Sequence, residues 1–261
     1  VEVEEPYYIC YQTETEITPL ITGGNGGPYT VEWSNGDEGN TITLPEDIDA
    51  LPNTYEITMT VTDDLGCSTT QLVEYEVLEP VLPTIIKDAD AVCKDGVDDF
   101  VQMMVDFVDV GNGPYTFEWD SNPVGLDWFG ANDENIVIID DENSASRSYT
   151  VIVIVTDDFG CEYRAETPFV VDNGPELEFE IDECFGSGFD LSGYTSGSES
   201  ITFELYYDED GDWNQDYTTL DNEELVLGPV FGTEIDYFAE EFGFYILVGT
   251  SQNGCKDFVI L

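Results

Sequence analysis

Apolar and polar residues alternate along several short segments of this chain. In the clearest one, apolar side chains fill every second position before residue 67: Tyr55, Ile57, Met59 and Val61. The matching positions before residues 161 and 255 are Tyr149, Val151, Val153 and Val155, and then Gly243, Tyr245, Leu247 and Gly249. A period of two is typical of a β-strand that buries one face. We therefore predict three equivalent strands, each with one face in a core.

A second alternating segment also occurs three times, as an apolar residue, a glutamate and another apolar residue. The copies are Val31-Glu32-Trp33, Phe117-Glu118-Trp119 and Phe203-Glu204-Leu205. The last residue of each copy is predicted to take an equivalent core position. No segment shows the i, i+3, i+4, i+7 apolar spacing of an amphipathic helix. Short strands separated by Gly, Asn, Asp and Pro predict an all-β fold.

A phrase that ends in cysteine repeats about every 90 residues, which is the size of one small domain. It reads Thr62-Asp63-Asp64-Leu65-Gly66-Cys67, then Thr156-Asp157-Asp158-Phe159-Gly160-Cys161, then Thr250-Ser251-Gln252-Asn253-Gly254-Cys255. The repeat predicts three domains in tandem, with boundaries at 1–80, 81–173 and 174–261. Proline marks the short linkers at 78–83 and 172–175, so we expect semi-rigid joints and a rod of three domains.

Six cysteines allow fifteen pairings, and the repeat selects one of them. It pairs the two cysteines of each predicted domain: Cys10 with Cys67, Cys93 with Cys161, and Cys184 with Cys255. Each bond would join the first strand region to the turn before the last strand. Metal binding by these thiols is disfavoured, because no C-x-x-C spacing and no histidine occur. Structural disulfides predict an extracellular or cell-surface location.

Charge narrows the range of partners. The 261 residues include 58 Asp and Glu but five Lys and Arg, for a formal net charge of -53. Nucleic acid and anionic membrane surfaces are therefore disfavoured as partners, and no apolar stretch is long enough to insert into a membrane. Because 41% of residues are apolar, the chain is expected to fold. Its acidity fits either a salt-adapted surface or calcium binding.

One acidic loop has the pattern of a calcium site. Oxygen ligands stand at alternate positions around a glycine, as a hard cation requires: Asp208, Asp210, Asp212, Asn214 and Asp216. The alternative is an acidic hairpin turn without metal. A further hypothesis places calcium at the joints, on Asp63, Asp64, Asp157 and Asp158, with solvated turns as the alternative.

The sequence favours a protein that is not an enzyme. The absence of histidine excludes Ser-His-Asp and Cys-His machinery, and no glycine-rich phosphate loop with a lysine occurs. A carboxylate-based hydrolase stays open, since paired acids can cleave glycosides. A carbohydrate-binding module is the main alternative, with sugars stacked on exposed aromatic residues. The candidates are Trp128, Phe129, Trp213 and Tyr217, for which a role in the core is the favoured interpretation.

The first repeat resembles the PKD-like and immunoglobulin-like repeats of large bacterial surface adhesins, of the gliding-adhesin type. The resemblance rests on Gly23-Gly24-Asn25-Gly26-Gly27-Pro28-Tyr29, Trp33-Ser34-Asn35-Gly36, Val61 through Cys67, and Glu79-Pro80. The second repeat matches through Trp119 and Cys161, whereas the third keeps mainly its cysteines. The resemblance implies tandem β-sandwiches that serve in display, adhesion or filament building, with other copies, surface proteins or glycans as partners. Tyrosines that enter the long strands resemble the tyrosine corner of such sandwiches, with ordinary core tyrosines as the alternative.

The chain ends suggest a route to assembly. Only six residues follow Cys255, among them Phe258, Val259 and Ile260, so the last sheet is expected to be short of strand length. Val1, Glu2 and Val3 are candidates to complete that sheet in a neighbouring copy by strand addition, which would give a head-to-tail filament. Two alternatives are that these residues form the first strand of their own domain, or that the chain was cut from a longer array.

Overall fold

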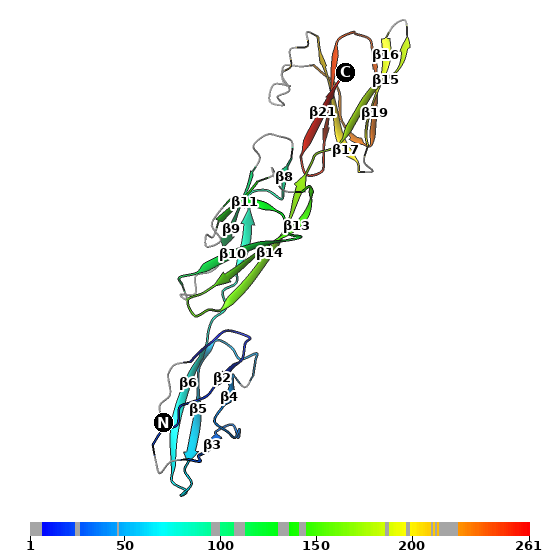
Figure 1. Cartoon of the computed structure of the whole chain (residues 1–261). Helices are drawn as coiled ribbons and strands as arrows, with labels where there is room; N and C mark the ends of the chain where they lie inside the picture. The colour runs from blue at the N-terminus through cyan, green and yellow to red at the C-terminus, as the bar shows by residue number, and fades with distance from the viewer. Residues whose placement is uncertain are drawn as a thin grey trace. The chain divides into compact units, whose positions relative to one another are not determined.

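The computed structural model describes residues 7–23, 27–45, 47–94, 100–106, 113–129, 136–140, 145–185, 188–196, 199–209, 211, 213 and 224–261 (Figure 1). By the density of its contacts the chain forms two compact units. One comprises residues 1–84, 106–117 and 154–165, and the other comprises 85–105, 118–153 and 166–261. The middle repeat contributes to both units, so the three predicted domain boundaries stay a prediction. Among the described residues, no helix is long and apolar enough to cross a membrane.

The first repeat is built from two sheets. Its strands are β1 (Tyr7–Ile9), β2 (Thr15–Ile17), β3 (Thr30–Trp33), β4 (Ile42–Leu44), β5 (Asn53–Thr62) and β6 (Ser68–Val77). One sheet has the order β1-β6-β5-β3 and the other pairs β2 with β4; the long neighbours β5 and β6 are cyan in Figure 1. Buried side chains from both sheets form one core, around Trp33, Leu44 and Met59. Two sheets that share a core make this repeat a β-sandwich.

The second repeat has the same plan with more strands. They are β7 (Thr84–Lys87), β8 (Ala91–Cys93), β9 (Phe100–Asp106), β10 (Thr116–Asn122), β11 (Asp127–Phe129), β12 (Ile136–Asp140), β13 (Arg147–Thr156) and β14 (Glu162–Asp172). The sheets have the orders β10-β13-β14-β8 and β11-β12-β9-β7. In both of the first two repeats, a short strand that leads into the first cysteine runs parallel to the last long strand: β1 beside β6, and β8 beside β14. We call this strand the first strand, although β7 precedes β8 in the second repeat.

The third repeat differs in how its first strand is used. Its strands are β15 (Leu177–Phe185), β16 (Gly188–Thr195), β17 (Ile201–Asp208), β18 (Glu224–Gly232), β19 (Glu234–Ala239), β20 (Phe244–Thr250) and β21 (Lys256–Ile260). The sheets have the orders β15-β16-β19 and β18-β17-β20-β21. Here β15 pairs along its length with β16. β21 pairs with β20 over five residues, whereas the last strands of the first two repeats, β6 and β14, have ten and eleven, so the last strand is short, as expected.

These sheets confirm the predicted fold class, an all-β chain of immunoglobulin-like sandwiches. The predicted core positions are confirmed, since Trp33, Trp119 and Leu205 are all buried. The tyrosine corner is also confirmed. The hydroxyls of Tyr55, Tyr149 and Tyr245 donate to the carbonyls of Leu51, Ala145 and Glu241, at 2.7, 2.8 and 3.0 Å. Tyr245 thus makes the contact that Tyr55 makes, although the sequence comparison matched Tyr55 with Gly243. The rest of the strand keeps the predicted match, since Leu247 is level with Leu205 as Met59 is with Trp33.

The predicted disulfide pairing is wrong. Cys10 is bonded to Cys161 and Cys93 to Cys255, instead of Cys10 to Cys67, Cys93 to Cys161 and Cys184 to Cys255. No described disulfide closes a single repeat.

The parallel first strands explain the correction. Because Ile9 is level with Val77, Cys10 follows one end of β6, whereas Cys67 precedes the other end. A ten-residue strand spans roughly 30 Å, while a disulfide needs Cα atoms within about 7 Å. In the second repeat, Cys93 is level with Asp172 at the end of β14, and Cys161 precedes its start. The two cysteines of each of these repeats are therefore too far apart to bond.

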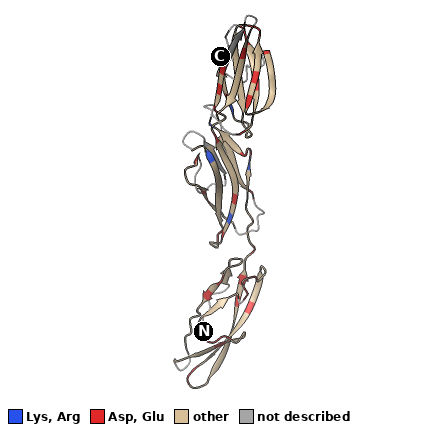
Figure 2. Cartoon of the chain, turned by 90° about the vertical axis from the view of Figure 1, so that its right-hand side faces the viewer, with Lys and Arg blue, Asp and Glu red and all other residues tan. Residues whose placement is uncertain are grey.

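Carboxylates occur on strands of all three repeats (Figure 2). Lys87 forms an ion pair with Asp90 at 2.8 Å, and the Arg147 guanidinium lies 5.0 Å from the centre of the Tyr149 ring. Five basic residues cannot neutralise 58 acidic ones. The surface therefore depends on salt or cations for screening.

Candidate functional site

The repeated cysteine phrase folds as one kind of tight turn, which we call the cysteine turn (residues 63–67, 157–161 and 251–255). In the first turn the Asp63 amide donates to the Cys67 carbonyl at 3.0 Å, and Gly66 has a φ of +83°. The Asp63 Oδ1 atom accepts hydrogen bonds from the amides of Leu65 and Cys67, at 3.0 and 2.9 Å. The phrase recurs because the turn needs a short polar side chain at its start and a glycine before its cysteine.

The other two turns repeat these contacts. Asp157 Oδ1 accepts from the amides of Phe159 and Cys161 at 3.0 and 2.9 Å. Ser251 Oγ accepts from the Cys255 amide at 3.2 Å, and Gly160 and Gly254 have φ values of +83° and +87°. The three cysteines therefore occupy equivalent positions in equivalent turns.

The first linkage joins the end of β1 to the second cysteine turn. The Cα atoms of Cys10 and Cys161 are 5.5 Å apart, within the range of disulfides, and Cys161 is 1% exposed. Tyr8 packs against Phe159 of the same turn, with ring centres 4.4 Å apart. All four residues belong to one compact unit. The bond is thus accompanied by an aromatic contact beside it.

A buried polar group lies next to this linkage. The Tyr163 hydroxyl is near the Asp157 carboxylate and the Val81 backbone, although neither that hydroxyl nor Asp157 Oδ2 makes a hydrogen bond of good geometry. Burial, followed by the negative charge of Asp157, raises the pKa of Tyr163 to about 12. An open hollow of about 710 Å³ adjoins these residues, with Cys10 and Tyr163 in its lining.

The second linkage joins the end of β8 to the third cysteine turn. The Cα atoms of Cys93 and Cys255 are 5.3 Å apart, and Cys255 is 0% exposed. Asp172, at the end of β14, accepts hydrogen bonds on Oδ2 from Ser251 Oγ at 2.9 Å and Asn253 Nδ2 at 2.8 Å. Both donors belong to the third cysteine turn, so hydrogen bonds reinforce the disulfide.

The linker after β14 lies close against the same turn. Asp172 Oδ1 also accepts from the Gly174 amide at 2.9 Å. Gly174 has a φ of +74°, and a Cβ atom there would lie 3.2 Å from the Lys256 carbonyl oxygen. The sequence pointed to this linker through Asp172-Asn173-Gly174-Pro175, but not to its contact with residues 251–256.

The first cysteine turn differs from the other two in its surroundings. Cys67 is a free, exposed cysteine, and Leu65, which takes the position of Phe159, is 71% exposed. The side chain of Cys184 lies outside the described residues.

The calcium loop lies mostly outside the described residues. Asp210, Asp212, Asn214 and Asp216 cannot be placed, so calcium binding there stays a prediction. Asp208 is described and 2% exposed, and its carboxylate accepts from the amides of Gly211 at 2.7 Å and Trp213 at 3.3 Å. Across the part of the chain that the structure describes, no group of three or more His, Cys, Asp or Glu is placed to hold a metal ion.

The assembly residues are only partly described. Val1, Glu2 and Val3 fall outside the described residues. Phe258, Val259 and Ile260 lie in β21, where they are level with Val248, Leu247 and Ile246 of β20. Strand donation therefore stays a prediction.

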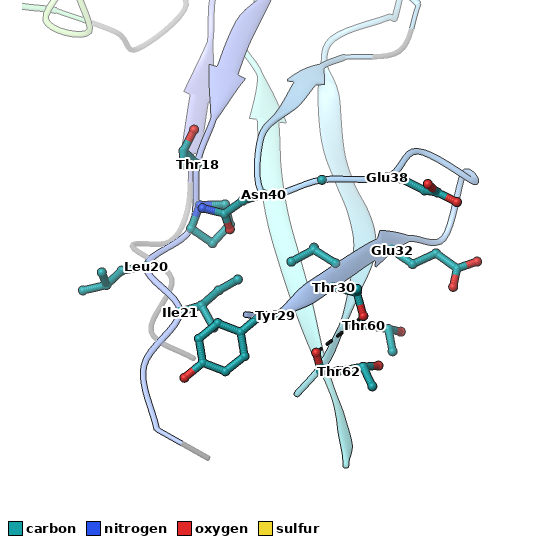
Figure 3. A pocket seen from close by; sticks show the side chains of 13 residues that line it. Thr18, Leu20, Ile21, Tyr29, Thr30, Glu32, Glu38, Asn40, Thr60 and Thr62 are labelled. Carbon is teal, nitrogen blue, oxygen red and sulfur yellow. Dashed lines mark hydrogen bonds between the residues drawn. The ribbon is translucent and has the colours of Figure 1, made fainter. Parts of the chain in front are cut away.

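A hollow in the first repeat bears on the glycan alternative. Its volume is about 920 Å³, and it is lined by residues of four segments, among them Ile21, Tyr29, Asn40 and Thr60 (Figure 3). Among the described residues that line it, Tyr29 is the one aromatic residue, and the Tyr29 hydroxyl already donates to the Gly23 carbonyl at 2.6 Å. Of the aromatics predicted to stack on sugars, Phe129 is 61% exposed, whereas Trp213 is 8% exposed and packs against Phe258.

Comparisons with known proteins give structural likeness without a family. No protein-family model and no curated protein matches the chain. Among solved structures, it is similar to the fibronectin(III)-like modules of CbhA from Clostridium thermocellum, with 14% identity, a TM-score of 0.38, and 64% of this chain and 90% of that chain covered.

Two further structures are similar over nearly the whole chain. A structure of a 1.5-MDa bacterial ice-binding adhesin has 14% identity and a TM-score of 0.37, with 97% of this chain and 91% of that chain covered. Titin domains A168–A170 have 13% identity and a TM-score of 0.33, with 96% and 91% covered. Likeness at this level does not bear on function.

Proposed function

We propose that the protein is an extracellular structural module whose immunoglobulin-like repeats are joined covalently, so that force along the chain passes through disulfides. The observation that carries this proposal is the pairing itself. In both bonds, the cysteine that ends the first strand of one repeat is linked to the cysteine turn of the next. Two such disulfides are typical of secreted or surface proteins. No reaction is assigned to the protein.

The two bonds interleave along the sequence, which has a mechanical consequence. Their sequence separations are 151 and 162 residues, and Cys93 lies inside the first loop while Cys161 lies inside the second. The chain therefore offers three parallel routes between the bonds, along residues 10–93, 93–161 and 161–255. Under tension, extension stops when the shortest route, residues 93–161, is taut.

Single-molecule stretching from the two ends of the chain tests the proposal. The oxidised protein is expected to extend to about one third of the length of the reduced protein, at 3.3 to 3.6 Å per free residue. Replacing both Cys10 and Cys161 with Ser should raise the extended length to only about two fifths of the reduced length. The Cys93–Cys255 bond still prevents the residues between these two cysteines from extending. Cys67→Ser is the matched control and should extend like the parent.

Equal extension of the oxidised and reduced proteins would contradict the proposal. So would an extension near three quarters of the reduced length in the double variant, because that value belongs to bonds that close each repeat separately.

We further propose that this module belongs to a surface adhesin or filament of the kind that the first repeat resembles. Support comes from the sequence motifs, the tandem sandwiches and the acidic surface. Glycan binding in the hollow around Tyr29 is the second candidate, supported by its ring and by the polar side chains of Glu32 and Asn40. A glycan array with the parent and Tyr29→Ala separates the two: sugar binding that the variant loses would favour the second.

A further inference from the structure

We infer that Cys67 forms a third disulfide between a cysteine turn and a first-strand cysteine, and that its partner is Cys184 of a second copy of this chain. This inference rests on the proposed function and extends it from joined repeats to joined molecules. The juxtaposition that carries it is found twice within the chain, where a first-strand cysteine meets a cysteine turn.

The three cysteine turns are equivalent, but only two are occupied. Cys161 and Cys255 hold the same turn position as Cys67, with the same pattern of amide donors around the first side chain of the turn. Each of these two is bonded to a first-strand cysteine of the preceding repeat. The turn of the first repeat has no preceding repeat within residues 1–261, and Cys67 is free.

The solvent exposure of the first cysteine turn differs from that of the two bonded turns. Cys161 and Cys255 are 1% and 0% exposed in their bonded turns, whereas Cys67 is exposed. The same holds beside the thiol. Phe159 packs on Tyr8 in the occupied turn, while the equivalent Leu65 is 71% exposed. The first cysteine turn therefore presents a thiol and an apolar side chain where the second turn has a bonded neighbour.

Cys184 lies at the end of its repeat that is far from the cysteine turn, which is also where Cys10 and Cys93 lie in their repeats. The start of β15 lies near the third cysteine turn, since Gly174 approaches the Lys256 carbonyl. Cys184 is seven residues beyond Leu177 in β15, roughly 20 Å further along the strand. It is therefore far from Cys255, as Cys10 is from Cys67 and Cys93 is from Cys161. The other four cysteines are already paired.

The bond forms by two exchange steps with a small-molecule disulfide as the oxidant. The Cys67 thiolate attacks that disulfide, forms a mixed disulfide and releases one small thiolate. The Cys184 thiolate of the second copy then attacks the Cys67 sulfur and releases the second small thiolate. Two protein thiols are oxidised and one small disulfide is reduced, and the two protons that leave the protein thiols are taken up by the two released thiolates.

Oxidation of the full chain in a glutathione redox buffer at high protein concentration tests the inference. The parent should give a ladder of covalent multimers on a non-reducing gel. Cys67→Ser and Cys184→Ser should each stay monomeric when alone. An equal mixture of the two variants should stop at a dimer, because it contains one free Cys67 and one free Cys184.

Tryptic mapping then identifies the bond in that dimer. Cleavage after Lys87, Arg164 and Lys256 separates a peptide of residues 1–87 from one of residues 165–256. The inference requires these two peptides to be linked. Parent protein that stays monomeric, or a symmetric dimer of either variant alone, would overturn it. A cysteine outside residues 1–261 bonded to Cys67 in protein from its natural source would overturn the second copy as the partner.

The inference and the proposed function fail separately. Loss of the multimers with intact Cys10–Cys161 and Cys93–Cys255 bonds would overturn only the inference. Absence of those two bonds from the monomer would overturn the proposed function itself.

Discussion

At the scale of single residues, the ionisation of Tyr163 is sensitive to the packing around the Cys10–Cys161 disulfide. Its hydroxyl is buried beside the Asp157 carboxylate, in the same turn as the bonded Cys161. Burial and that negative charge both oppose ionisation of the phenol, so the pKa of Tyr163 rises to about 12. The folded state therefore favours the neutral phenol more than the unfolded state does.

This shift predicts a loss of stability in alkali. A raised pKa stabilises the fold fully below about pH 10, and that contribution disappears as the pH rises from about 10 to 12. In a Cys67→Ser background, which limits thiol exchange, we expect the free energy of unfolding in urea to fall less steeply between pH 10 and 12 when Tyr163 is Phe. The same slope with and without the Tyr163→Phe change would contradict the assigned burial.

At the scale of elements, the cysteine turns and the linker at 172–175 position the second linkage. Gly174 has both a positive φ and a close approach to the Lys256 backbone. Gly36 has a φ of +97° but open space around its Cβ position, so it serves as the matched control. Gly36→Ala should cost about 1 kcal/mol of stability from backbone strain alone.

Gly174→Ala should cost about 1 to 3 kcal/mol more, because its methyl group also meets a carbonyl oxygen that belongs to a paired strand. Urea unfolding of the two variants and the parent measures the difference. Equal losses in the two variants would show that the linker does not pack against the turn.

The sequence predicted elements better than it predicted their connections. Alternation identified β5, β13 and β20, and the tyrosine corners of the first two repeats followed from Tyr55 and Tyr149, whereas that of the third is two residues from the matched position. The disulfides were missed because residue spacing places Cys10 in a first strand without giving its direction. Only the parallel pairing of β1 with β6 shows that Cys10 and Cys67 lie at opposite ends of their repeat. Asp172 was missed as a site residue because its partners, Ser251 and Asn253, are distant in sequence.

At the scale of the whole molecule, the central claim is that disulfides join successive repeats instead of closing each one. On the loop-entropy estimate, each bond would stabilise the folded chain by about 5 kcal/mol. Such covalent support suits a chain with a formal net charge of -53, whose carboxylates repel one another when salt is low.

The five basic residues allow a direct measurement of this claim. Trypsin cleaves after Lys87, Lys94, Arg147, Arg164 and Lys256, which separates Cys93 and Cys161 onto small peptides of their own, 88–94 and 148–164. Mass spectrometry of the unreduced digest should find peptide 1–87 linked to 148–164, and peptide 88–94 linked to 165–256. A link between 88–94 and 148–164 would contradict the account, because it places the bond within the second repeat.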